Sequence, residues 1–190
     1  MYIEGAPDIS AEIAKTPKFA IIEEDDCFAP RREVSISYTG ANIRKIVKSI
    51  PKIITDSLRV TSTNVFLDEY YLDNTDPNAV QFHIFYHGFK NLDKRTKALL
   101  EIKIKDGLIK PDGSGSLTLE FKGTLKTTFE RRTVLQRTPF YDMFFKMYSY
   151  LFYDEMRRQF LTRCKEFSEN SMRKTKEILK LMETAVYPHT

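Results

Sequence analysis

The sequence predicts an α+β fold: an antiparallel sheet wrapped around a long C-terminal helix, with a kinked helix pair between the first two strands. Three observations predict it. Between residues 64 and 129, stretches of alternating apolar and polar residues are joined by short connections, which is typical of antiparallel strands. Residues 41–60 have apolar residues three and four positions apart, as in a helix. The same helical spacing runs from residue 140 to about residue 182.

Length and composition indicate one domain with a sizeable core. The chain has 190 residues, of which 42 % are hydrophobic and 29 % are charged, and this composition excludes a largely disordered protein. No apolar stretch reaches the roughly 18 residues that span a bilayer, and the first residues lack the pattern of a signal peptide. We therefore expect a protein without a transmembrane segment.

The two cysteines, Cys27 and Cys164, lie far apart in the sequence and form no CxxC or metal-binding spacing. This usage predicts no disulfide framework and no metal site, and it favours the reducing cytoplasm as the location. Each cysteine is expected to pack as a small apolar residue.

Charge divides the chain into two parts. Seven acids against two lysines give residues 1–30 a net charge of −5, whereas residues 31–190 carry +9. Three prolines also mark the first part, which predicts an acidic, partly ordered N-terminal arm. Within this arm, residues 18–22 could add a short strand to a sheet edge. Residues 31–190 are predicted to form a single α+β domain whose C-terminal helix continues as an extension from about residue 168.

This predicted domain begins with a strand and a helix pair. Side chains at residues 34–38 alternate between apolar and polar, which predicts a half-buried strand. The helical pattern at 41–60 has lysines and arginines opposite its isoleucines. Pro51 lies inside it, lacks the backbone N–H and clashes with the preceding turn, so two short helices or one kinked helix are expected.

Four strand-like stretches follow; turn-forming residues at 73–78 separate the first two, and those at 107–115 separate the last two. The last stretch can bend at Gly123 and continue to Phe129. Because the connections are short, we expect an antiparallel meander. The four stretches are residues 64–72, 79–88, 97–105 and 117–121.

The C-terminal helix is predicted to start at Thr138 and Pro139, a capping hydroxyl followed by a proline at the first helical position. The weak helix formers of residues 168–171 predict a break, or the point where the helix leaves the domain. Residues 140–153 are apolar nearly all the way round, so the sheet alone cannot cover them. The second cover could be the helix pair, the arm, another subunit or a membrane surface, although Asp142 and Asp154 disfavour a membrane.

This order of elements resembles the helix-grip fold of the START-like, polyketide-cyclase-like (SRPBCC) superfamily. The resemblance rests on 34–38 as the first strand, 41–60 as the helix pair, 64–129 as the meander and 139–167 as the helix across its concave face. Residues 135–141 also look like small archaeal-type proteins of unassigned function. The resemblance implies a cavity between sheet and helix, which in such proteins often holds lipids or other hydrophobic molecules.

We therefore expect a non-enzymatic protein that holds a hydrophobic small molecule, a lipid or a partner segment between the sheet and the C-terminal helix. The chain has no GxSxG, HExxH, Walker or GxGxxG motif, which favours a protein without catalytic residues or cofactors. Tyrosines suit a cavity wall because an apolar ring carries a hydroxyl that can orient a ligand. The candidate ligand-binding residues are Phe82, Tyr86, Tyr141, Phe145, Tyr148 and Phe152.

The histidines and paired acids predict neither a metal site nor a catalytic site. His83 and His87 would lie roughly 13 Å apart on one face of a strand, too far for one metal ion. Asp68 and Glu69 are neighbours on a strand and should point to opposite faces, so no acid–base pair is expected. A cyclase- or aromatase-like enzyme is the second alternative, supported only by His83 and the cavity tyrosines.

The first alternative is a basic RNA- or ribosome-associated module whose acidic arm masks its positive surface. Arginines and lysines gather toward the C-terminus, where they could follow phosphates. Interleaved glutamates favour a solvated helix with ion pairs instead. Homo-oligomerisation through the aromatic part of the C-terminal helix is also expected as an alternative. The candidate nucleic-acid contacts are Arg157, Arg158, Arg173 and Lys174.

Overall fold

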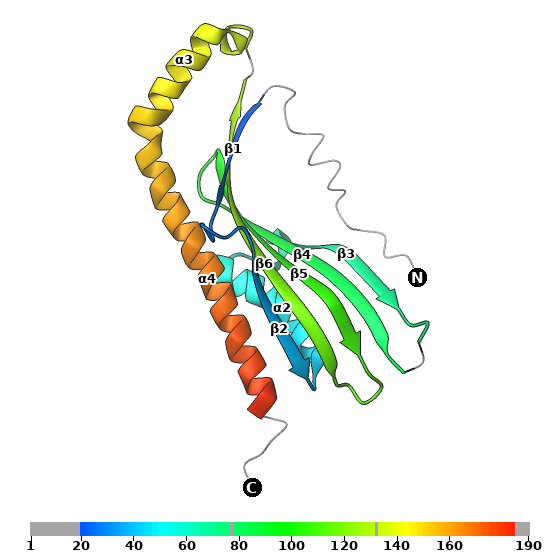
Figure 1. Ribbon diagram of the computed structural model, residues 1–190. Coiled ribbons are helices and arrows are strands. Elements are labelled where there is room, and N and C mark those ends of the chain that lie inside the picture. The colour runs from blue at the N-terminus through cyan, green and yellow to red at the C-terminus, as the bar shows by residue number, and fades with distance from the viewer. Residues whose placement is uncertain (1–19, 77, 132, 185–190) are drawn as a thin grey trace.

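The structure is a computed structural model that describes residues 20–76, 78–131 and 133–184. It has an antiparallel six-stranded sheet with two helices packed on one face, which confirms the predicted α+β class (Figure 1). No helix in these residues is both long and apolar enough to cross a membrane. The strands are β1 (Ala20–Asp26), β2 (Val34–Gly40), β3 (Val65–Asp73), β4 (Val80–Asn91), β5 (Thr96–Ile109) and β6 (Gly115–Glu130).

Strand β6 organises the sheet because three strands pair with it. The order is β1-β6-β5-β4-β3, and β2 pairs with β6 on the same edge as β1. Strand β2 pairs with the first half of β6, from Gly115 to Phe121, and β1 pairs with the second half, from Thr124 to Glu130. Between the two, the Cys27 N–H donates to the Gly123 carbonyl at 2.9 Å. Strand β6 thus continues through Gly123, as the sequence predicts.

The acidic run of the N-terminal arm lies inside a strand. A short edge strand was expected at 18–22, and β1 instead runs from Ala20 to Asp26, so it includes all four consecutive acids. Glu23 and Asp25 both bind Arg157 on the C-terminal helix, the second at 2.7 Å. Residues 1–19 lie outside the described part, and the division into an arm and a domain therefore stays a prediction.

Two short helices or one kinked helix were predicted, and the structure has one continuous helix, α2 (Ile43–Leu58). Pro51 is inside it and removes one backbone hydrogen bond. Buried side chains lie on both sides of the proline, and their packing on the sheet holds the two halves in one helix. These side chains are Ile43, Ile46, Ile50, Ile53, Ile54 and Leu58.

The C-terminal helix runs without interruption through α3 (Pro139–Tyr148), a π-helical turn (Ser149–Tyr153) and α4 (Asp154–Thr184). Its predicted start is confirmed, since the Thr138 hydroxyl accepts the Tyr141 N–H at 3.3 Å. The predicted break at 168–171 is wrong. Ser168 and Ser171 are buried, and a Cβ on Gly123 would lie only 2.2 Å from Ser168 Oγ. These small residues let α4 approach the sheet closely.

Helices α2 and α4 cover the same face of the sheet, which we call the core face. In Figure 1, α2 lies behind the strands and α4 runs beside β2 and β6. The main core joins α2, the sheet and the C-terminal half of α4, with Phe121 of β6 fully buried within it. The opposite face of the sheet, here the open face, bears the alternate residues of β4, β5 and β6.

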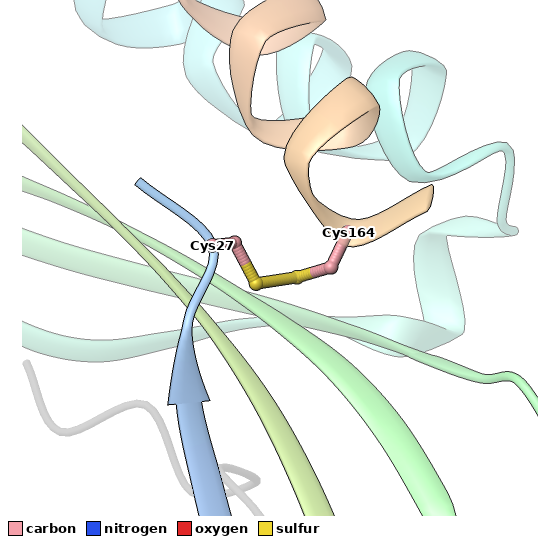
Figure 2. Close-up of a disulfide and its surroundings, with 2 residues drawn as sticks. All are labelled: Cys27 and Cys164. Atoms are coloured by element: carbon pink, nitrogen blue, oxygen red, sulfur yellow. A yellow bond between two sulfur atoms is a disulfide. The ribbon is translucent and has the colours of Figure 1, made fainter. Parts of the chain in front are cut away.

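A disulfide joins Cys27, directly after β1, to Cys164 in α4 (Figure 2). The two Cα atoms are 5.6 Å apart, and both cysteines are 1 % exposed. The expectation of unpaired cysteines was therefore wrong, because a separation of 137 residues hides a contact that only the fold creates. Disulfides are typical of oxidising compartments, so the cysteines no longer support a reducing location.

Candidate functional site

An open groove of about 1360 Å³ lies along the open face of the sheet and reaches α3. Strands β4, β5 and β6 supply its floor, the β4–β5 turn supplies one end, and three α3 side chains form a wall. By contrast, the space between the sheet and α4 contains buried side chains of the two core clusters. The main residues of the groove are Asp68, Phe85, His87, Phe89, Lys94, Arg95, Lys97, Leu99, Glu101, Lys126, Tyr141, Phe145 and Tyr148.

The strand register arranges the floor of the groove in three rows. His87 lies opposite Glu101 in the first row, and Phe89 lies opposite Leu99 in the second. In the third, Lys97 lies opposite both Asn91 and Lys126. The apolar row therefore separates an imidazole–carboxylate end from a basic end.

The first end of the groove contains a part-buried carboxylate–imidazole pair. Asp68 occupies a β-bulge, since the register of β3 on β4 shifts between Leu67 and Glu69. A bulge re-aims a side chain, and here Asp68 Oδ2 lies 2.5 Å from His87 Nδ1. The side chains are 6 % and 15 % exposed, respectively. Phe66 stacks on the imidazole with ring centroids 5.1 Å apart.

The other end of the groove is basic. Lys97 Nζ lies 5.2 Å from the centre of the Phe89 ring, and the Arg95 guanidinium lies 5.5 Å from that of Phe129. Lys94 and Lys126 also line this part of the groove, as does Arg131, which is paired with Asp142; Glu24 lies 3.3 Å from Lys126. This end can receive a negatively charged group.

The wall of the groove is anchored through the π turn. A π turn inserts one extra residue into a helix and rotates the next helical turn about the axis, so Tyr153 and Phe145 both contact Phe129, with centroids 5.2 and 4.7 Å away. The Tyr153 hydroxyl lies 2.5 Å from that of Thr96 and also donates to Asp93 at 3.4 Å. Burial is the main cause that raises the pKa of Tyr153 above its usual value.

The structure brings together three of the six predicted ligand residues: Tyr141, Phe145 and Tyr148 line the groove. Phe82 is buried in the core, where its ring packs against Gly107. Tyr86 also packs against the core, and burial raises its pKa. The side chain of Phe152 lies outside the described part of the structure.

Helix α3 presents a large apolar surface to solvent, which we call the exposed α3 face. All ten residues of α3 are described, and none of them is buried. The acid of this helix, Asp142, forms an ion pair with Arg131. The exposed α3 face consists of Phe140, Met143, Phe144, Met147, Tyr150 and Leu151, whose exposed fractions range from 45 % to 79 %.

The four candidate nucleic-acid contacts all have acidic or amide partners. Arg157 binds the acids of β1. Arg158 lies 2.9 Å from Asp154. Arg173 binds Asn170 at 2.8 Å and lies 4.0 Å from Glu177, and Lys174 lies 3.7 Å from Asp56. Ion pairs are therefore present on this helix, and among the interleaved glutamates Glu177 takes part in one; the other acids are Asp154, Asp56 and those of β1.

Neither the floor of the groove nor the pairing of Asp68 with His87 was predicted from the sequence. One sequence feature did indicate an apolar floor. Leu99 and Leu100 are adjacent in a strand, so one of the two side chains must lie on the open face. Nothing in the sequence indicated that Asp68 faces the groove. Its side-chain direction was inferred from regular strand alternation, and a bulge reverses that alternation. His83 lies beside Glu69 at 3.4 Å and outside the groove.

No family model and no curated protein matches the chain. A protein of unknown function from Staphylococcus aureus matches at 11 % identity and TM-score 0.21, covering 82 % of this chain and 98 % of that chain. A putative uncharacterized protein from Rhizobium leguminosarum matches at 9 % identity and TM-score 0.24, covering 82 % and 99 %. The human StarD13 lipid transfer and protein localization domain matches at 7 % identity and TM-score 0.16, covering 90 % and 98 %.

Proposed function

We propose that the protein is a non-enzymatic binding protein that holds a hydrophobic small molecule or lipid in the groove between the open face and α3. The observation that carries this proposal is the groove itself, whose volume of about 1360 Å³ exceeds that of most small-molecule pockets. Its aromatic floor and wall provide an apolar surface, and its charged ends provide orientation. The ligand was expected between the sheet and the C-terminal helix, and the residues of that helix that line the groove belong to α3.

Two adjacent phenylalanines of α3 give a matched test. Phe145 lines the groove, whereas Phe144 belongs to the exposed α3 face. With the fluorescent acid 11-(dansylamino)undecanoate as probe, Phe145→Ser is expected to weaken binding about tenfold, because an aromatic contact is lost. Phe144→Ser should bind like the wild type. Equal effects of the two substitutions, or no binding by the wild type, would contradict the proposal.

The exposed α3 face favours self-association as a second property. Contiguous apolar surface of this kind marks interaction sites in soluble proteins, and methionines adapt to a partner surface. In sedimentation velocity, Phe144→Asp is expected to shift the wild-type oligomer toward monomer, with a dissociation constant raised at least about tenfold. Gln159→Asp, an exposed site on α4, should leave the distribution unchanged. A wild type that stays monomeric at high concentration would rule this property out.

The remaining alternatives are weaker. An RNA- or ribosome-associated module stays a prediction, because its four candidate contacts are engaged with acids and amides of the same chain. A cyclase-like enzyme would need His83 near Tyr148, and only the second of these lines the groove. A cytoplasmic location also stays a prediction. A disulfide as deeply buried as this one would be shielded there from thiol reductants.

A further inference from the structure

We propose that the groove selects an elongated hydroxy acid, with its hydroxyl at His87 and its negative group at the β4–β5 turn. The apolar body of this ligand would lie on Phe89 and Leu99 between the two ends. The inference rests on the proposed function and names the class of ligand that the groove takes. Its basis is the order of the three rows on the open face.

The Asp68–His87 pair provides the hydroxyl site. A carboxylate can only accept hydrogen bonds, so Nδ1 is the ring nitrogen that donates to Asp68. Nε2 is the other ring nitrogen, and a ligand hydroxyl can pair with it because a hydroxyl both donates and accepts hydrogen bonds. Within the described residues, Nε2 has no hydrogen-bond partner, and His87 lines the groove. The stacked Phe66 ring fixes the plane of the imidazole.

The charges around His87 favour a hydroxyl over an acid at this end. Asp68 and Glu101 both face the imidazole, and their side chains are largely buried. Lys122 reaches Glu101 only at 3.9 Å and is itself exposed, so it neutralises this end incompletely. A carboxylate would meet the like charges of Asp68 and Glu101 here, whereas a hydroxyl can form a hydrogen bond with Nε2 without that repulsion.

The β4–β5 turn provides the site for the negative group. Lys94, Arg95 and Lys97 border the groove there. The acid of the turn, Asp93, accepts hydrogen bonds from the backbone N–H groups of Arg95 and Thr96 at 2.7 and 2.6 Å. These donors compensate the Asp93 charge, and the three cations therefore dominate this end.

The spacing of the two ends sets the length of the ligand. Lys97 and Glu101 lie on the same face of β5, four residues apart. Four residues of a strand span roughly 13 Å, a distance that an extended chain of about ten to twelve carbons covers. We therefore choose 12-hydroxydodecanoate as the test ligand. Dodecanoate, which lacks the hydroxyl, is the comparison ligand.

The test is a pair of calorimetric titrations on the full-length protein. The wild type is expected to bind 12-hydroxydodecanoate about five- to tenfold more tightly than dodecanoate, the effect of one buried hydrogen bond. The double variant Asp68→Leu/His87→Phe replaces both polar partners together and should bind the two acids equally. The matched control, Glu69→Leu/His83→Phe, removes the exposed pair on the same strands and should keep the wild-type ratio.

The outcomes separate this inference from the proposed function. Equal binding of the two acids by the wild type, or an unchanged ratio in the first double variant, would overturn the inference and leave hydrophobic binding intact. Failure of both acids to bind would overturn both. If the double variant does not fold, NMR of the wild type still tests the inference. The His87 Nε2 resonance should shift on addition of 12-hydroxydodecanoate and stay in place on addition of dodecanoate.

Discussion

Replacing both Cys27 and Cys164 with alanine is expected to lower the free energy of unfolding by about 2–5 kcal/mol. The disulfide closes a loop of 137 residues, and cross-links over long loops restrict the unfolded chain most. It also joins the end of β1 to α4, two elements that otherwise meet mainly through Arg157 and the acids of β1. Urea denaturation of the oxidised protein and the variant measures the difference.

Reductant provides the control for the disulfide. The wild type unfolded and refolded with a phosphine reductant should show the stability of the double variant, whereas the variant itself should not respond. Two free thiols in the denatured, unreduced wild type would contradict the disulfide directly. Equal stability of the oxidised wild type and the variant would contradict its stabilising effect.

The substitution Phe121→Ala is expected to lower the free energy of unfolding by about 3–5 kcal/mol. Phe121 is fully buried and is one of the largest side chains of the main core. It pairs with Val34 of β2 on one side and Ile102 of β5 on the other. Its removal leaves a cavity where three strands meet the helices, and a close-packed core fills such a cavity only in part.

The matched control for Phe121→Ala is Phe140→Ala on the exposed α3 face. Phe140 is 67 % exposed, so its removal should change the free energy of unfolding by less than about 0.5 kcal/mol. Urea denaturation of both variants under one set of conditions tests the contrast. A loss of about 3–5 kcal/mol in Phe140→Ala would show that α3 is covered in solution, whereas a loss below about 0.5 kcal/mol in Phe121→Ala would show that Phe121 contributes less than its burial indicates.

The strands and their faces could be predicted from sequence because alternation is a local signal. Leu100, Ile102 and Ile104 lie on the core face of β5, as their spacing indicates. The start of the C-terminal helix was equally local, since the Thr138 cap and Pro139 act within one turn. The continuity of α2 through Pro51 could not be predicted locally, because packing on the sheet outweighs the free-energy cost of a proline inside a helix.

The groove was predicted only in part because it depends on contacts distant in sequence. The aromatic wall of α3 was visible as an apolar helix, and Tyr141, Phe145 and Tyr148 do line the groove. The floor required the register of three strands, and the Asp68–His87 pair required a bulge that reverses local alternation. So apolar a segment was expected to have a second cover; within the described residues α3 is exposed, and cover by another subunit stays a prediction.

The pairing of β1 and β2 with β6 has a consequence for how the chain folds during synthesis. Ala20 pairs with Glu130, and Val34 pairs with Phe121, so β2 lacks its partner until residue 121 has been synthesised and β1 lacks its partner until residue 130. Contacts of such high sequence separation slow folding, since the intervening loop must close first. Until then the nascent chain carries two unpaired strands. We therefore expect slow, late acquisition of structure and a period in which these strands can pair with the wrong chain.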